Sequence, residues 1–295
     1  HEVLELLDFE HGCAQDGRDA ATLVAELGER HGIRATEQHA LLTAALPSIL
    51  ETPLDGAQTG LPAGFCLRQL ERKSRIDELG FDLRLGAGSH YRMTADPSAG
   101  LIDPAAARLA LAARLEDEPS WPGATWLRQL LEQPNVLPSI AGILTGFIDL
   151  VLRSGSEARS ARYYVADYKT NRIAAPAARR QSQLVHYTQP FLHREMTRHG
   201  YPLQALLYSV ALHRLLQQRL GEHYDYDQHV GGYLYLFLRG MQGSQPNRDG
   251  GLALGVLHDR WPRYVVLGLD AALHGATAAA VAKLMDAARR PGAAR

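Results

Sequence analysis

The stretch from Gly142 to Asn171 reads GILTGFIDLVLRSGSEARSARYYVADYKTN, and the rest of the chain is organised around it. Two apolar runs, Ile143–Leu152 and Tyr163–Tyr168, flank a polar connection that is rich in serine, arginine and glycine. Branched and aromatic residues bounded by turn-forming residues are typical of strands. The stretch therefore predicts a β-hairpin.

Each predicted strand carries one carboxylate that its apolar neighbours do not explain. Asp149 interrupts the first apolar run, and Asp167 interrupts the second. An ionised carboxylate buried without a partner is costly, so such residues usually meet a counter-charge or a metal. Lys169 follows Asp167 by two residues, and because side chains alternate along a strand, these two share one face.

Two acids and a lysine on one sheet are the parts needed for metal-assisted cleavage of a phosphodiester bond. The carboxylates would hold Mg²⁺, and the ammonium would orient the attacking water or offset developing negative charge. The alternative is a structural ion pair of Asp149 with Lys169 or with an arginine. Residue usage favours catalysis, because only three of the 31 Lys and Arg residues are lysines and one of them stands here.

Further motifs follow the predicted hairpin. The segments YPLQALLYSVALHRLL and YDYDQHVGGYLYLFLRGM begin at Tyr201 and Tyr224, and the chain opens with HEVLELLDFEHG. Together with GFIDLV and YYVADYKTN, they resemble the C-terminal nuclease domain of RecB, the beta subunit of exodeoxyribonuclease V, in the PD-(D/E)XK nuclease superfamily. The resemblance is close from Gly142 to Met241 and thin between residues 14 and 135. It implies an α/β fold with a central mixed β-sheet flanked by helices, the restriction-endonuclease-like core of that superfamily.

The resemblance also implies the metal ligands. Asp149 and Asp167 supply the core carboxylates, and the backbone carbonyl of Tyr168 reaches the ion. His1 takes the place of the histidine that opens the first helix of the family. The implied cofactor is Mg²⁺, for which Mn²⁺ or Ca²⁺ can substitute in binding, and an imidazole ligand favours tolerance of Mn²⁺.

A further ligand is expected on the segment Arg75–Leu85, whose alternating apolar and polar residues predict a strand. In the family a glutamate before the hairpin completes the metal site, and Glu78 aligns best with it. Asp77 stays open as the alternative, because strand alternation cannot seat both side chains on one face. A plain acidic strand edge is the structural alternative.

By the same resemblance, Lys169 is the catalytic lysine. Gln204 and Tyr208 lie at positions i and i+4 of a predicted helix, so they share one face of it. They match the Q-x(3)-Y element that follows the hairpin in the family, where both side chains face the active site. We therefore expect both to act with Lys169.

Periodicity outlines the remaining elements. It predicts helices over residues 19–31, 36–50, 104–115, 181–199, 202–220 and 270–288, an apolar strand over 229–239, and only a connection over 116–138. We expect residues 1–70 to form a helical segment that packs on the core and carries one metal ligand. Residues 71–295 are expected to form the nuclease core, the whole being a single domain.

Composition narrows the class of protein. The 295 residues are 46% hydrophobic and 21% charged, which is ordinary for a globular protein, and no apolar run reaches the roughly 20 residues of a membrane span. Two cysteines suggest neither a disulfide framework nor a zinc site, so a reducing cytoplasm is expected. A net charge of −1 argues against a tight, free-standing DNA binder, because phosphate neutralisation dominates such affinity.

The resemblance implies a Mg²⁺-dependent DNA nuclease domain of a helicase–nuclease subunit that processes double-strand ends for recombinational repair. Helicase activity driven by ATP is expected only from a missing N-terminal part, since no P-loop motif occurs and the chain opens with His1. The expected partners are single DNA strands from unwound ends and RecC- and RecD-like subunits, with no membrane. Two alternatives are an inactive nuclease-fold module that binds DNA or a partner, and a stand-alone PD-(D/E)XK nuclease. The intact D-x(17)-D-x-K and Q-x(3)-Y spacings argue against the first, and the segment that begins at Tyr224 argues against the second.

Overall fold

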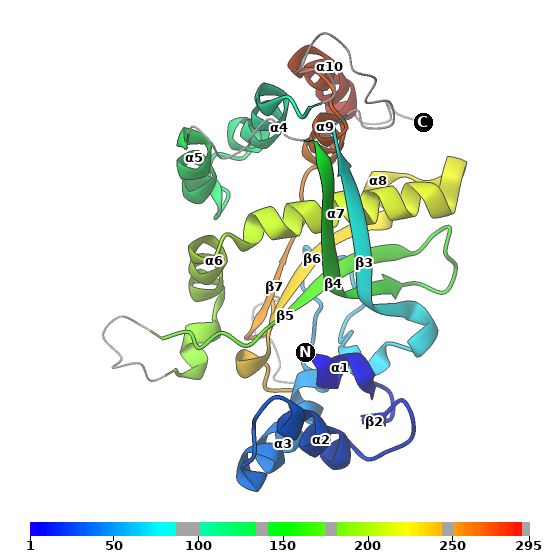
Figure 1. The fold of residues 1–295 in the computed structure, drawn as a ribbon, viewed down its shortest axis with the longest axis vertical. Helices are drawn as coiled ribbons and strands as arrows, with labels where there is room; N and C mark the ends of the chain where they lie inside the picture. The colour runs from blue at the N-terminus through cyan, green and yellow to red at the C-terminus, as the bar shows by residue number, and fades with distance from the viewer. Residues whose placement is uncertain (87–100, 134–140, 175–181, 244–250, 291–295) are drawn as a thin grey trace.

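The computed structural model of the protein describes residues 1–86, 101–133, 141–174, 182–243 and 251–290. At its centre is a five-stranded sheet in the order β3-β4-β5-β6-β7 (Figure 1). The strands span Arg75–Leu85 (β3), Gly142–Ser154 (β4), Arg162–Lys169 (β5), Val230–Phe237 (β6) and Val256–Asp259 (β7). Strands β5 and β6 pair in parallel, and all other neighbours pair antiparallel. The predicted hairpin and the predicted mixed sheet are confirmed.

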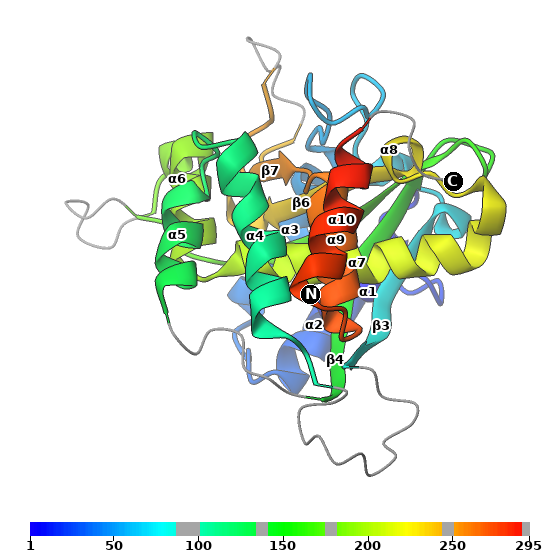
Figure 2. The same ribbon diagram turned by 90° about the horizontal axis from the view of Figure 1, so that it is seen from above.

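Helices of the C-terminal part cover one face of the sheet (Figure 2). They are α4 (Pro104–Asp117), α5 (Ala124–Glu132), α6 (Gln189–Arg198), α7 (Tyr201–Leu220), α8 (Tyr226–His229), α9 (Arg263–Leu273) and α10 (Ala278–Arg289). Tyr233 and Tyr235 of β6 point into this layer, where they pack with residues of α7 such as Leu206. Across the described segments, no helix combines the length and the apolar character that crossing a membrane requires.

The N-terminal segment covers the other face at one end of the sheet (Figure 1). It contains α1 (Glu2–Leu6), α2 (Ala20–Arg30), α3 (Thr36–Glu51) and the short strands β1 (Leu7–Asp8) and β2 (Cys13–Ala14). Leu234 and Leu236 of β6 face this segment, as strand alternation requires. Strand β6 is therefore buried on both faces, which explains its unbroken apolar sequence.

The β3–β4 ribbon exchanges its faces halfway along. On β4, Ile148 packs with the C-terminal helices, whereas Leu150 packs with the N-terminal segment, although two positions of one parity normally share a face. On β3, Glu78 has a φ of 48°, which makes it the one non-glycine residue with positive φ in the described ranges. We attribute the exchange of faces to this break in the strand.

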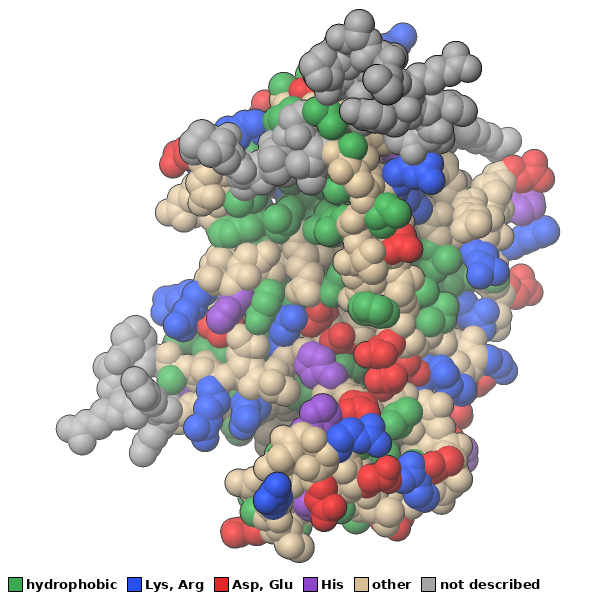
Figure 3. Space-filling model, viewed as in Figure 1, with side chains coloured by type: hydrophobic (Ala, Val, Ile, Leu, Met, Phe, Trp, Pro, Cys, Tyr) green, Lys and Arg blue, Asp and Glu red, His purple; other side chains and the backbone are tan. Residues whose placement is uncertain are grey.

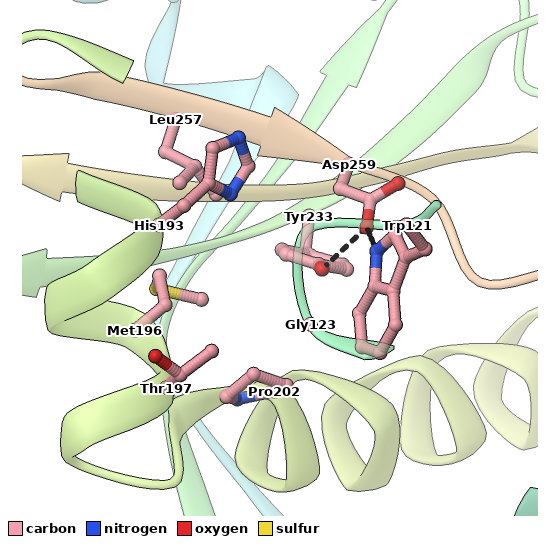
Figure 4. A pocket seen from close by; sticks show the side chains of 9 residues that line it. All are labelled: Trp121, Gly123, His193, Met196, Thr197, Pro202, Tyr233, Leu257 and Asp259. Carbon is pink, nitrogen blue, oxygen red and sulfur yellow. Dashed lines mark hydrogen bonds between the residues drawn. The ribbon is translucent and has the colours of Figure 1, made fainter. Parts of the chain in front are cut away.

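A buried ion pair ties the edge strand β7 to helix α4. Arg114 donates to both oxygens of Asp259 at 3.1 and 3.0 Å, and its guanidinium lies over the rings of Trp121 and Trp261, whose centroids are 5.1 Å apart. Trp121 and Tyr233 donate to the same carboxylate at 2.8 and 2.9 Å (Figure 4). Because several donors satisfy this partly buried carboxylate, the cluster is a structural anchor.

Three predictions about helices are wrong. The single helix expected over 181–199 is a 3₁₀ turn, Leu184–Tyr187, followed by α6; residue 181 itself lies outside the described residues. The alanine-rich helix expected over 270–288 is divided, because Gly275 has a φ of 85° and Thr277 starts α10 by accepting from the Ala280 amide at 3.4 Å. The connection expected over 116–138 contains α5, and its residues 134–138 also lie outside the described residues.

Candidate active site at the fork of the sheet

Strands β4 and β5 part from each other at the position of the two predicted acids. Their pairing reaches Leu150 and Ala166 and does not continue to the next residues. Beyond this point β4 continues beside β3, whereas Asp167 pairs with Tyr235 of β6. Figure 1 shows the resulting fork, with β4 rising beside β3 and β5 turning away with β6. Asp149 and Asp167 thus lie at the point where the sheet opens.

Asp149 is held at this fork by a backbone donor and faces helix α1. The Tyr168 amide donates to Asp149 Oδ2 at 2.9 Å, and His1 Nδ1 lies 3.4 Å from the same oxygen. Burial raises the pKa of Asp149, while the Tyr168 amide and the charge of Lys169 oppose that rise. The structure therefore places the His1 ring beside Asp149.

Asp167 is almost completely buried, with 2% of its surface exposed. Burial raises its pKa to about 6, the nearby charge of Asp149 adds to the rise, and Lys169 opposes it. Lys169 Nζ lies 2.5 Å from Asp167 Oδ2, so the expected sharing of one strand face is found. One ammonium thus faces a buried and a partly buried carboxylate, an arrangement whose excess negative charge suits a hard cation.

Helix α7 supplies the two predicted polar residues. Lys169 Nζ lies 3.4 Å from Gln204 Oε1, and Gln204 Nε2 donates to the Tyr208 hydroxyl at 2.8 Å. Tyr208 interacts in turn with Asp167. Burial of Tyr208 raises the pKa of its phenol, and the negative charge of Asp167 raises that pKa further. Tyr208 therefore stays protonated and can donate to the carboxylate. The spacing of i and i+4 places both side chains toward the fork.

Two tyrosine rings contact the Lys169 ammonium, and these contacts were not predicted. Its ammonium lies 4.2 Å from the ring centroid of Tyr201 and 5.3 Å from that of Tyr235. The two rings stack with centroids 5.6 Å apart, and the Tyr235 hydroxyl donates to Gln204 Oε1 at 2.9 Å. Tyr201 stands one helical turn before Gln204 on α7. This spacing was the one sequence signal that could have placed Tyr201 on the same helix face as Gln204.

The two acids of β3 have different surroundings. The side chain of Asp77 is 4% exposed, with Oδ2 2.9 Å from Arg72 Nη1 and 3.4 Å from Arg75 Nε. Glu78 is exposed and stands in register opposite Asp149, between the paired positions 77 and 79. Glu5 of α1 lies near Glu78. Burial of Glu5 raises the pKa of its carboxyl, and the negative charge of Glu78 raises that pKa further. Asp77 is thus engaged by arginines, whereas Glu78 faces the helix that carries His1.

Tyr168, whose carbonyl is a predicted ligand, follows Asp167 on strand β5, and its side chain is buried against the N-terminal segment. Its ring centroid lies 6.1 Å from that of His1. Within the described residues, no three His, Cys, Asp or Glu side chains form a group that could hold a metal ion as they stand. The predicted ligands come together as the pair of His1 with Asp149, with Asp167 beside it across the fork.

The chain is similar in sequence to RecB subunits of bacteria. The chain is 36% identical over 232 residues to the RecBCD enzyme subunit RecB of Mycobacterium tuberculosis, which covers 78% of this chain and 19% of that protein. It is 33% identical over 288 residues to RecB of Mycolicibacterium smegmatis, covering 92% of this chain and 23% of that protein. The chain is RecB-like.

A third relative is RecB of Escherichia coli, 41% identical over 115 residues, or 39% of this chain and 9% of that protein. The chain thus spans about a fifth of the length of the mycobacterial relatives that it matches. No protein-family model matches it.

Proposed function

We propose that this chain is a Mg²⁺-dependent DNA nuclease domain with the restriction-endonuclease-like core of the PD-(D/E)XK superfamily. The observation that carries the proposal is the fork, where Asp149 and Asp167 from two parting strands meet with Lys169 against Asp167. The RecB-like sequence supports a DNA substrate and a role in DNA repair. Hydrolysis of the phosphodiester backbone is the chemistry that these side chains suit.

Each residue then has a task. Asp149 and Asp167 would bind Mg²⁺ together with His1, Glu78 and the Tyr168 carbonyl. A Mg²⁺ ion bound there supplies polarisation of the scissile phosphate and a water of lowered pKa. Lys169 places positive charge beside the phosphate, where it offsets the negative charge that grows during attack.

Gln204 and Tyr208 hold the lysine and the acid in place. Gln204 faces the ammonium with its oxygen while it donates to Tyr208, so its amide orientation is fixed from both ends. The protonated Tyr208 hydroxyl steadies Asp167. The side chains at the fork are thus oriented before substrate binds, which is the basis of electrostatic stabilisation.

The relatives are named as one subunit of the RecBCD enzyme. By extension we propose that the protein that contains this chain works in the cytoplasm with RecC- and RecD-like subunits on double-strand ends. Single strands from the unwound duplex would then reach the fork.

Cleavage of single-stranded DNA by the purified chain tests the proposal. Cleavage should require Mg²⁺ and stop when EDTA is added. Lys169→Ala should lower the rate on the order of 10²-fold or more without unfolding the chain, because one electrostatic stabiliser is lost. Lys73→Ala, at a lysine whose side chain is 76% exposed, is the matched control and should cut normally. A parental rate for Lys169→Ala would show that the lysine is not catalytic.

Metal affinity separates the two acids of β3. Glu78→Gln should weaken Mn²⁺ binding measured by titration calorimetry, whereas Asp77→Asn should leave it unchanged, because Asp77 faces Arg72 and Arg75. The opposite result would transfer the ligand role to Asp77.

A further inference from the structure

Among the described residues, no helix or strand covers one face of the part of the β3–β4 ribbon that extends beyond the fork. Leu79, Phe81 and Leu83 pack on the side of the C-terminal helices. On the other side, Ile143 and Phe147 are 67% and 61% exposed. In Figure 3, hydrophobic side chains lie on the ribbon above a gathering of acidic and histidine side chains, and basic side chains lie to the left of that gathering.

Phe147 is held in place by a crossed pair of glycines and phenylalanines. Gly80 pairs with Phe147, and Phe81 pairs with Gly146. The Phe81 ring turns inward, with its centroid 5.8 Å from that of Tyr208. The Phe147 ring lies beside Gly80, where a Cβ atom would be 3.4 Å from Phe147 Cε1. One ring thus serves the core, and the other is presented to the exterior.

The exposed ring belongs to the strand that carries Asp149. Phe147 precedes Asp149 by two residues of β4, which corresponds to about 7 Å along a strand. Burial in the core does not explain this aromatic side chain, because most of it is exposed.

A basic residue stands on the opposite side of the fork. Strands β5 and β6 are parallel, with Lys169 paired to Phe237, so their carboxyl ends reach the same edge. Arg239 follows two residues later, is exposed, and donates through Nε to the Thr170 carbonyl at 2.9 Å. This hydrogen bond holds the guanidinium just beyond the catalytic lysine.

We propose that a single DNA strand crosses the fork from Phe147 to Arg239. A nucleobase stacks on the Phe147 ring, the scissile phosphate lies between the carboxylates and Lys169, and Arg239 binds a neighbouring phosphate. The inference rests on the proposed nuclease function and adds two residues, Phe147 and Arg239, that position its single-stranded substrate. A base can expose its flat face to a protein ring only when it is unstacked, so the strand must be single.

Binding to two oligomers tests both ends of this track. One probe is a fluorescein-labelled oligothymidylate of about 12 nucleotides, within the usual size of single-strand sites. The other is a deoxyribose-phosphate oligomer of the same length that lacks every base. Affinity is measured by fluorescence anisotropy at low salt with Ca²⁺ in place of Mg²⁺, so that cleavage is slow.

Phe147→Ala should bind oligothymidylate about tenfold more weakly, as expected for the loss of one stacked base. The baseless oligomer should not distinguish Phe147→Ala from the parent, and Phe147→Trp should restore the affinity. Ile143→Ala, on the same exposed face but farther from Asp149, should bind like the parent. An equal loss for Ile143→Ala, or a loss that persists with the baseless oligomer, would overturn the stacking role.

Arg239→Gln should weaken binding of both oligomers and lower the slope of log affinity against log salt by about 0.7, the value for one phosphate contact with a single strand. Arg219→Gln, at the exposed end of α7, is its control. An unchanged slope for Arg239→Gln would remove Arg239 from the track.

Cleavage in Mg²⁺ is measured separately. A chain that binds through Phe147 but never cuts would refute the nuclease proposal alone, and a chain that cuts without using Phe147 would refute the track alone.

Discussion

Asp167 shows how a candidate catalytic residue can weaken the fold that carries it. Its carboxyl is buried, and burial raises its pKa to about 6. The folded state therefore binds a proton more readily than the unfolded chain does. The stabilising contribution of that proton is complete below the unfolded pKa near 3.9 and is lost as the pH rises through about 6.

Asp167→Asn should consequently raise the free energy of unfolding at pH 8 in metal-free buffer, because the amide stays neutral. The gain should be on the order of 2 kcal/mol at pH 8 and should fade toward pH 4. Urea denaturation at both pH values measures it, and Asp286→Asn, whose side chain is 72% exposed, is the control. A parent more stable than Asp167→Asn at pH 8 would contradict the direction of the pKa shift.

Tyr201 is the residue whose role was least visible in the sequence. Its ring lies under the Lys169 ammonium, and a partly desolvated cation–π contact is worth about 1–2 kcal/mol. Tyr201→Leu should lower kcat for single-stranded DNA about tenfold with KM nearly unchanged, since the lysine loses its position and the DNA contacts remain. Tyr201→Phe keeps the ring and should keep most of the activity. Equal losses for Phe and Leu would place the effect in the hydroxyl or in packing.

At the scale of elements, the sequence predicted the strands well because their patterns are local. The expected strand Arg75–Leu85 has those bounds in the structure, and the hairpin pairs antiparallel. Periodicity could not predict the exchange of faces at Glu78, because it assumes that one side of a strand stays on one side of the sheet. Nor could it divide the alanine-rich helix at Gly275, because alanine favours helix on both sides of the break.

The same limit applies to the site. Asp167 and Lys169 share a strand, so their contact followed from spacing alone. The meeting of His1 with Asp149, and of Tyr201 with Lys169, depends on how α1 and α7 pack on the sheet. Such tertiary contacts leave no local periodicity in the sequence, and the resemblance supplied only the first of the two.

The break at Glu78 has a measurable consequence for stability. A residue with a side chain and a φ of 48° is strained by about 1–2 kcal/mol, and glycine is not. Glu78→Gly should therefore be about 1 kcal/mol more stable than Glu78→Ala in urea denaturation. Asp82 on the same strand is the control, and there Ala should be the more stable substitution, as is usual within strands. The usual order at both positions would show that Glu78 is not strained.

At the scale of the whole molecule, charge limits what this chain can do alone. With a net charge of −1, the chain neutralises few DNA phosphates and so releases few of their counterions on binding. Its affinity for single-stranded DNA should therefore be weak and should fall as salt rises. The side chains at the fork are nevertheless already in contact with one another. We therefore expect the salt dependence to lie in KM, with kcat nearly constant once DNA is saturating. Steady-state cleavage at a series of salt and DNA concentrations measures both constants.

A partner that feeds DNA into the fork would raise the local concentration of DNA there and correct a KM defect without changing the chemistry. If turnover stays low at saturating DNA and low salt, the fork must instead be completed by contacts that this chain lacks.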